Sequence, residues 1–190
     1  MSDADESDAA LMRRYARGDA AAFGLLYRRH EMRVWRYLYR NVGNRDTADE
    51  LMQEVWFAVA REAGRYQPSA RFSTWLFTVA RNRMIDVLRA RRPQVSLDSL
   101  GYEAEPVLQQ LTTEPSVGPL AAAVVRDQTS AISAAMEQLP REQRDAFLLQ
   151  LEGDLSVEEV AAVTGSSFET TKSRLRYARS KLRELLSEYA

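Results

Sequence analysis

The last third of the chain, residues 151–186, carries two helical patterns that meet at a corner marked by glycine. Ser156 followed by Glu159 is a capping-box pattern, which predicts a helix beginning at the next residue after the serine. Gly165 ends this helix, because glycine readily takes the left-handed conformation that follows a helix terminus. A second helix is predicted to run to about Leu186. Two helices joined by so tight a turn indicate a helix-turn-helix, which restricts this part of the chain to helical packing.

The second of these helices is strongly basic. Between positions 172 and 183 it has no acidic residue, and its basic residues are Lys172, Arg174, Arg176, Arg179, Lys181 and Arg183. Such a helix suits contact with DNA phosphates, while its first turn reaches base edges in the major groove. The alternative is an αα-hairpin with a solvated basic face. The coincidence of the corner, the capping box and the basic helix favours DNA binding.

The first half of the chain predicts further helices, over about 9–17, 19–41, 47–62 and 71–92. Asp19 is the expected cap of the second, and Asp46 or Thr47 that of the third. His30 falls on the apolar stripe of the second helix, so we expect a packed histidine. Because the chain has no cysteine and no other histidine, we expect no metal site, no nucleophile–base pair and no cofactor.

The predicted helix over 47–62 has an acidic face that also carries Trp56 and Phe57. Its polar members are Asp46, Asp49, Glu50, Gln53 and Glu54. Acidic residues near a helix N-terminus can be ordinary capping, since the helix dipole stabilises them. An acidic cluster flanked by aromatic residues also suits docking onto a basic protein. The residues alone leave both interpretations open.

The predicted helix over 71–92 is basic and follows a loop over 64–70 that ends the preceding helix. Tyr66, Phe72 and Trp75 lie at this junction, and the helix holds six arginines against Asp86 alone. Arginines interleaved with aromatic rings are typical of surfaces that bind single-stranded nucleic acid. The alternative is that the aromatic residues belong to the core, which is the favoured interpretation for Phe72.

Residues 93–119 form the clearest linker. They hold four of the six prolines, and no basic residue lies between Arg92 and Arg126. Proline resists continuous helix, and this composition cannot build a core. Helix is expected to resume over about 120–138 and, after Pro140, over 141–151. The sequence therefore predicts an all-α protein of two small helical domains, 1–92 and 120–190, joined by a flexible linker.

Overall composition excludes several classes of protein. The chain has 190 residues, with 26 basic and 27 acidic side chains, so its net charge says nothing about nucleic acid. No apolar run approaches the length of a membrane span, and the acidic start is unlike a signal peptide. Without cysteines, disulfides are excluded and a reducing compartment is allowed. The expected location is the cytoplasm, without membrane insertion.

In this order, the acidic helix, the basic helix, the linker and the helix-turn-helix resemble the extracytoplasmic-function class of bacterial RNA polymerase sigma factors. The stretches that carry the resemblance are DTADELMQEVWFAVARE (46–62), FSTWLFTVARNRMIDVLRAR (72–91), LPREQRDAFLLQLEGDLSVEEVAAVTG (139–165) and TKSRLRYARSKLRELL (171–186). The resemblance implies binding to core RNA polymerase, recognition of the minus-ten and minus-thirty-five promoter elements, and strand opening. It implies no catalysis, and an anti-sigma protein is a partner that it allows.

The resemblance also implies site residues. Those placed on the β′ coiled coil of the polymerase are Asp46, Asp49, Glu50, Gln53, Glu54 and Trp56. Those near the minus-ten element are Arg65, Tyr66, Arg71, Trp75, Arg81, Asn82, Arg89 and Arg92. Those near the minus-thirty-five element are Ser167, Glu169, Thr170, Lys172, Ser173, Arg174, Arg176 and Arg179. The C-terminal domain is further expected to touch the β flap.

One stretch departs from the family pattern. Where the family usually has a Val-Gly-Thr-Val-like run, this chain has Phe168-Glu169-Thr170-Thr171. Thr171 puts a hydroxyl at a packing position. Glu169 either accepts a hydrogen bond from cytosine or complements the helix N-terminus, and the second interpretation is favoured.

A competing hypothesis is a stand-alone repressor or activator that shares the helix-turn-helix. The two hypotheses assign different roles to residues 46–57 and 71–92, because a repressor needs neither a polymerase-docking face nor a helix that captures a DNA strand. An enzyme is a distant third possibility, since no phosphate-binding glycine loop, metal set or nucleophile–base pair is visible.

Overall fold

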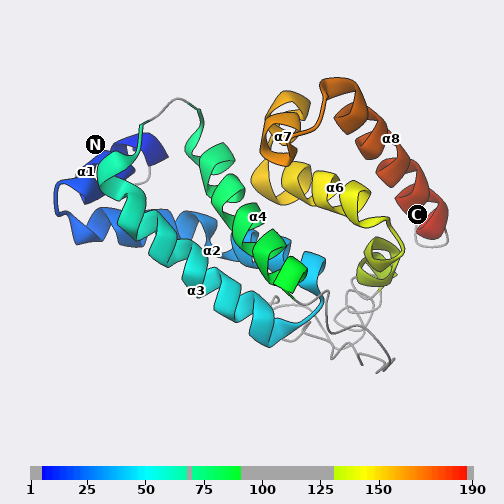
Figure 1. The fold of residues 1–190 in the computed structure, drawn as a ribbon, viewed down its shortest axis with the longest axis horizontal. Helices are drawn as coiled ribbons and strands as arrows, with labels where there is room; N and C mark the ends of the chain where they lie inside the picture. The colour runs from blue at the N-terminus through cyan, green and yellow to red at the C-terminus, as the bar shows by residue number, and fades with distance from the viewer. Residues whose placement is uncertain (1–5, 68–69, 91–130, 188–190) are drawn as a thin grey trace, which may run out of the picture.

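The fold is that of a computed structural model, which describes residues 6–67, 70–90 and 131–187. Within these ranges every regular element is a helix, as the sequence predicted (Figure 1). The N-terminal helices are α1 (Asp8–Ala16), α2 (Ala20–Val42), α3 (Arg45–Glu62), the short 3-10 helix η1 (Ala63–Arg65) and α4 (Phe72–Ala90). The C-terminal helices are α6 (Arg141–Gly153), α7 (Val157–Thr164) and α8 (Phe168–Leu185), preceded by a helical stretch over 131–137.

Side-chain caps set where the N-terminal helices begin. Ser7 caps α1, and Asp19 accepts hydrogen bonds from the backbone of Ala21 and Ala22 at the start of α2, as predicted. The expected cap of α3 was wrong. Asn44 caps this helix by accepting from the Thr47 backbone N–H at 2.9 Å, so Asp46 and Thr47 lie inside the first turn.

The helix-turn-helix has the predicted local chemistry. The Ser156 backbone N–H donates to the Glu159 carboxylate at 2.8 Å, and the Glu159 N–H donates to the Ser156 hydroxyl at 3.2 Å. Gly165 ends α7 with φ of 64°, and the Ser166 N–H bonds back to the Ala161 carbonyl at 3.0 Å. Both ends of α7 are therefore capped by hydrogen bonds.

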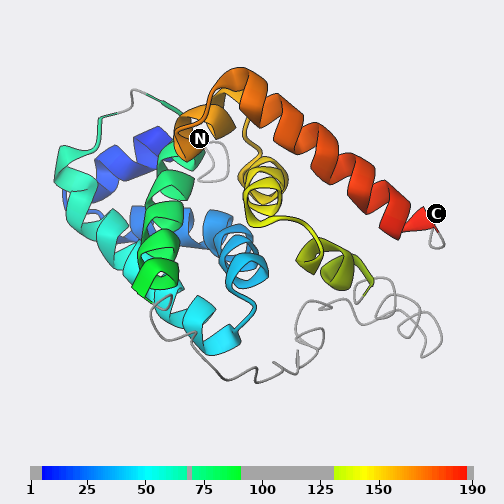
Figure 2. The same ribbon diagram turned by 45° about the vertical axis from the view of Figure 1, so that its right-hand side comes forward.

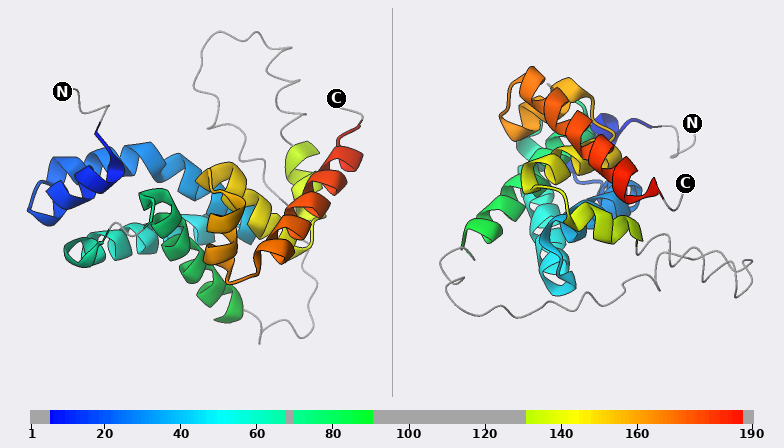
Figure 3. Two further views of the ribbon diagram at one scale, coloured as in Figure 1. Left: turned by 90° about the horizontal axis from the view of Figure 1, so that it is seen from above. Right: turned by 90° about the vertical axis from the view of Figure 1, so that its right-hand side faces the viewer.

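The N-terminal and C-terminal helices pack against each other around one continuous hydrophobic core. Figure 2 shows α6 and α7 beside α2 and α4, and Figure 3 shows the same arrangement from above. The rings of Tyr37 on α2 and Phe77 on α4 meet edge to face at 5.4 Å between centroids. Gly153 at the end of α6 lies against Phe77, because a Cβ placed there would be 3.4 Å from that ring.

Two expectations fall partly or wholly on residues that are not described. The linker over 93–119 lies outside the described residues, and the helix predicted over 120–138 is described only over 131–137. Across the described ranges, none of the helices combines the length and apolar character needed to cross a membrane.

Candidate nucleic-acid and polymerase interfaces

The acidic face of α3 is largely open to solvent. Asp46, Glu50, Gln53 and Glu54 are exposed. Asp49 is half-buried, and its carboxylate accepts a hydrogen bond from the Trp35 indole N–H at 2.6 Å, so it also holds α2 against α3. The exposed members form a solvated acidic ridge of the kind predicted for protein docking.

The placement of Trp56 on this exposed face was wrong. Trp56 is only 5% exposed and packs against Phe23 and Tyr27 of α2, because it lies four residues after the buried Met52. Its indole nitrogen is buried with no hydrogen-bond partner among the described residues. The neighbouring Phe57 is 73% exposed instead.

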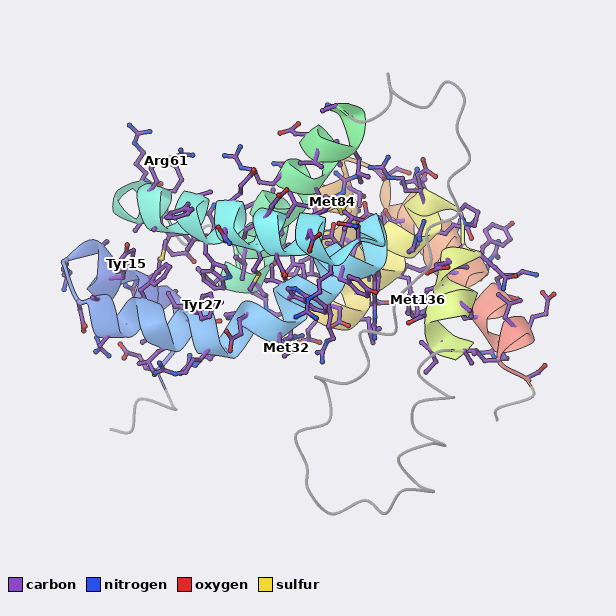
Figure 4. All side chains as sticks on the ribbon, turned by 90° about the horizontal axis from the view of Figure 1, so that it is seen from below. Tyr15, Tyr27, Met32, Arg61, Met84 and Met136 are labelled. Atoms are coloured by element: carbon purple, nitrogen blue, oxygen red, sulfur yellow. The ribbon has the colours of Figure 1, made fainter. Side chains whose placement is uncertain are left out.

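A shallow apolar groove lies between α2 and α3, next to the acidic ridge. Its lining residues are Phe23, Tyr27, Met52, Gln53, Trp56, Phe57 and Ala60. Figure 4 shows Tyr27 on α2 at this side of the molecule, and Arg61 projecting outward from the far end of α3. The exposed aromatic edge therefore adjoins the exposed acidic residues of the same helix.

An aromatic cluster stands where η1 leads into α4. Tyr66 lies 5.2 Å from Trp75 and 6.0 Å from Phe72 between ring centroids. Phe72 is buried, as favoured from the sequence, whereas Trp75 is half-buried. The Tyr66 hydroxyl is buried without a partner among the described residues, and burial raises its pKa. Arg65 beside it is exposed.

The minus-ten candidates on α4 and next to it divide into two groups. Asn82 and Arg89 are exposed on α4, whereas Arg92 lies outside the described residues. Arg81 forms an ion pair with Asp145 of α6 at 2.8 Å, and Arg71 forms one with Glu159 of α7 at 3.5 Å. The second group thus contacts the C-terminal helices.

The first two turns of α8 present the minus-thirty-five candidates. Ser167 caps the helix by accepting from the Thr170 N–H at 3.1 Å. Glu169, Thr170 and Lys172 are exposed, and the Lys172 ammonium lies 5.9 Å from the Phe168 ring centroid. This end of α8 therefore offers polar groups and positive charge to a groove.

The remaining arginine candidates on α8 have partners at the corner, on α6 or within α8 itself. Arg174 donates to the Ser166 hydroxyl at 2.6 Å, which ties α8 to the corner, and Ser173 is half-buried. Arg179 donates to the side-chain oxygen of Gln150, and Arg176 lies 5.0 Å from the Tyr177 ring centroid. Arg176 and Arg179 are exposed.

His30 is a packed residue, as expected. It is 6% exposed, its Nε2 lies 2.8 Å from the Asp8 carboxylate, and its ring faces Phe72 at 5.3 Å. Burial raises the pKa of Asp8, but hydrogen bonds with His30 and Arg29 outweigh this and leave it lowered. No group of acidic, histidine or cysteine side chains in the described part of the chain is arranged to hold a metal.

Sequence reasoning missed the acidic residues of α6. Asp145 and Glu152 are 6% and 4% exposed, respectively, and both accept hydrogen bonds from the N-terminal helices. Their spacing of seven residues places them on one helix face. This spacing was the one feature of the sequence that could have identified them as a pair. Nothing in the sequence indicated which arginines would pair with these two carboxylates.

These features define a helical DNA-binding protein with a helix-turn-helix and a second basic surface. Residues 26–94 match the family of sigma-70 region 2, and residues 129–182 match that of sigma-70 region 4. The chain is 33% identical over 177 residues to the RNA polymerase sigma factor CarQ of Myxococcus xanthus, covering 93% of this chain and 96% of that protein. It is also 33% identical over 172 residues to the ECF sigma factor RpoE of Cereibacter sphaeroides, covering 89% and 88%.

The chain belongs to the extracytoplasmic-function (ECF) group of sigma-70 RNA polymerase sigma factors. It is 33% identical to ECF sigma factor SigE of Mycolicibacterium smegmatis as well, of which it spans 66% of the length. Two solved structures share its fold at 23% identity. One is CnrH in complex with the cytosolic domain of CnrY, with a TM-score of 0.68 over 97% of this chain and all of that chain. The other is RpoE of Bartonella quintana with the anti-sigma factor NepR, with a TM-score of 0.61 over 81% and 89%.

Proposed function

We propose that this chain is a promoter-specificity subunit with no catalysis of its own, which binds core RNA polymerase and promoter DNA in the cytoplasm. The observation that carries the proposal is the order of surfaces in an ECF-group chain: an acidic α3, an arginine-rich α4 and an exposed, basic α8. A repressor would need only the last of these. We assign 1–92 to a domain that binds polymerase and the minus-ten element, and 120–190 to one that binds the minus-thirty-five element, with the linker between them.

The docking surface for the β′ coiled coil is the exposed ridge of α3. Asp46, Glu50, Gln53 and Glu54 are its contacting residues, because they are exposed and three or four positions apart along one helix. Asp49 contributes from its half-buried position while it holds Trp35. Trp56 acts by supporting the ridge from the core side, since it is 5% exposed.

The minus-ten surface is built by η1, the aromatic cluster and α4. Arg65, Asn82 and Arg89 are exposed, and Tyr66 and Trp75 form a ring surface on which an unstacked base can pack. Arg71 and Arg81 are phosphate contacts that need release from their present carboxylate partners. Arg92 extends this basic series along the sequence.

The minus-thirty-five surface is the N-terminal half of α8. Ser167, Thr170 and Lys172 face outward at the start of the helix, where base edges are read. The arginines further along, Arg176 and Arg179, contact phosphates. Arg174 and Ser173 position the helix against the corner, and Glu169 complements the helix N-terminus.

Regulation by an anti-sigma protein belongs to this proposal. The two solved structures of the same fold each contain a bound partner, the cytosolic domain of CnrY with CnrH and the anti-sigma factor NepR with RpoE. The compact packing of α6 and α7 on α2 and α4 leaves the groove between α2 and α3 open in this chain. The β flap of the polymerase is the further partner proposed for the C-terminal helices.

The test is co-elution of the purified chain with core RNA polymerase, followed by transcription from templates with randomised promoter elements. A stable complex that enriches transcribed templates is the expected result. The double variant Glu50→Gln, Glu54→Gln should lose most of the complex, whereas Glu142→Gln, Glu184→Gln, which removes two exposed acids elsewhere, should keep it. Tight duplex binding by the chain alone, without a polymerase complex, would instead support the repressor.

A further inference from the structure

A large apolar side chain lies exposed at the start of α8. Phe168 is the first residue of this helix and is 41% exposed. Its spacing of three residues before Thr171 would by itself place it with the apolar face of the helix. It is nevertheless outside the hydrophobic core, because the buried face begins at Thr171 and continues through Leu175, Ala178 and Leu182. Figure 2 shows α8 along the outer edge of the molecule. The ring of Phe168 is therefore apolar surface that the packing of the helices leaves unused.

Lys172 restrains this ring from one helical turn further along. Its ammonium lies 5.9 Å from the centroid of the Phe168 ring, at the spacing of four residues that brings two side chains onto the same side of a helix. The charge is attracted to the face of the ring. A side chain that is already restrained loses less conformational entropy when it binds a ligand. The pair therefore presents an ordered apolar group next to a positive charge.

The hydroxyls of the first turn are already engaged with each other and with the backbone. The Ser167 hydroxyl accepts from the Thr170 N–H at 3.1 Å and donates to the Thr170 hydroxyl at 2.8 Å. The other exposed side chains over 167–172 are Phe168, Glu169 and Lys172. This turn therefore projects an apolar ring, a carboxylate and an ammonium.

These groups suit base edges better than the DNA backbone. The exposed carboxylate of Glu169 repels phosphates, and the ring of Phe168 has no hydrogen-bond donor or acceptor with which to bind one. In the major groove each base pair presents donors and acceptors, and thymine adds the C5-methyl group, which is the apolar feature of that groove. An apolar side chain on the first turn of a helix in the groove is therefore matched by thymine.

We propose that Phe168 is a specificity-determining residue that reads the C5-methyl group of a thymine in the minus-thirty-five element. The ring packs on the methyl group as the first turn of α8 enters the major groove, and Lys172 brings its charge to the neighbouring bases. This inference deepens the proposed function, and it rests on that function only in taking α8 as the reader of duplex DNA. Phe168 begins the stretch that departs from the family pattern, so the preference for thymine is a property of this chain.

The experiment first finds the thymine and then removes its methyl group. The full chain, alone and with core RNA polymerase, selects from a duplex library with a randomised centre, and the selection is repeated with Phe168→Ala. A thymine enriched by the parent and not by the variant marks the position. Binding is then measured by fluorescence anisotropy for the enriched duplex and for the same duplex with deoxyuridine at that position. Deoxyuridine keeps the base pair and the O4 acceptor and lacks only the methyl group.

The parent should bind the deoxyuridine duplex about threefold to fivefold more weakly, which is the effect of leaving one methyl group unburied. Phe168→Ala should bind both duplexes with equal affinity. Phe168→Gln, which keeps the length and helix propensity of the position but is polar, should also bind them equally. Cytosine replaced by 5-methylcytosine at the same position should restore part of the affinity for the parent alone.

Two further variants separate this contact from charge and from general effects of truncation. Lys172→Gln should weaken binding to both duplexes but keep the ratio between them, because the ring remains. Met32→Ala is the matched control, since Met32 on α2 is 44% exposed and is likewise a large apolar side chain. It should change neither the affinity for the enriched duplex nor the ratio. Circular dichroism and the urea midpoint confirm that each variant is folded.

Three results would overturn the proposal. One is a ratio between thymine and deoxyuridine that survives in folded Phe168→Ala or Phe168→Gln. Another is equal binding of the two duplexes by the parent. The third is a selection in which no thymine is enriched, with or without polymerase. Failure of the proposed function would look different, because the chain would then form no complex with core polymerase while the chain alone still showed the methyl effect on duplex binding.

Discussion

Thr171 offers a sharp test of the packing between α8 and α7. Its side chain is fully buried, and its hydroxyl has no hydrogen-bond partner among the described residues. An unsatisfied buried hydroxyl costs about 1–3 kcal/mol, and valine has nearly the same shape and a similar helix propensity. The substitution Thr171→Val should therefore raise the free energy of unfolding by about 1–2 kcal/mol. This stabilisation would come at a position where the family pattern itself favours an apolar β-branched residue.

Urea denaturation measures this change directly. With an m-value of about 2 kcal/mol/M, the midpoint should rise by about 0.5–1 M while m stays constant. The matched control is Thr164→Val, because the Thr164 hydroxyl donates to the Val160 carbonyl at 2.8 Å and is therefore satisfied. That variant should be no more stable than the parent. A Thr171→Val protein with an unchanged or lower midpoint would refute the account of the buried hydroxyl.

Three further predictions concern capping, DNA contact and pH. Ser156→Ala removes half of the capping box and should lower the free energy of unfolding by about 1 kcal/mol in the same urea assay, whereas a change below a few tenths would contradict the role of the cap. Arg176→Gln should weaken duplex binding and reduce the slope of log K against log salt by about 0.9, and an unchanged slope would remove this residue from the phosphate contacts. Burial raises the pKa of Glu159, but hydrogen bonds from Thr74 and the Ser156 N–H and the charge of Arg71 outweigh this and leave it below 4.5. Its contribution to stability is therefore present above about pH 4.5 and is lost as the pH falls through the lowered value, so Glu159→Gln should flatten this part of the stability profile.

Local chemistry explains why the helix-turn-helix was predictable. The capping box and Gly165 act within a few residues of the helix they delimit, so their effect can be inferred without knowing the rest of the fold. The cap of α2 at Asp19 follows the same rule. At α3 several capping residues stand side by side, and the structure selected Asn44, because its side chain reaches the Thr47 N–H.

Tertiary packing explains what the sequence could not predict. Trp56 was placed on the exposed face, but α2 approaches from that side and its rings enclose the indole. Asp145 and Glu152 look like ordinary solvated acids until the position of α2 and α4 is known. The contacts of Asp145 and Glu152 join residues more than sixty positions apart, so no local pattern specifies them. The roles of the proposed DNA and polymerase residues stay predictions.

The two proposed DNA surfaces differ in how far their side chains are free of contacts with other helices. The first turns of α8 are exposed with the helices packed together, whereas Arg71, just before α4, and Arg81 on α4 are paired with carboxylates. We therefore expect duplex binding through α8 to proceed with the helices packed together, whereas strand binding by Arg81 should require α6 to separate from α4. The variant Asp145→Asn, Glu152→Gln removes the carboxylates that pair with Arg81, Arg36 and Arg40. It should accordingly bind single strands tighter but bind duplex with nearly the parental affinity, after allowing for the two removed negative charges by comparison with Glu142→Gln, Glu184→Gln. Equal gains for both substrates would indicate a general charge effect, because these ion pairs lie against α2 and α4 and leave the start of α8 open.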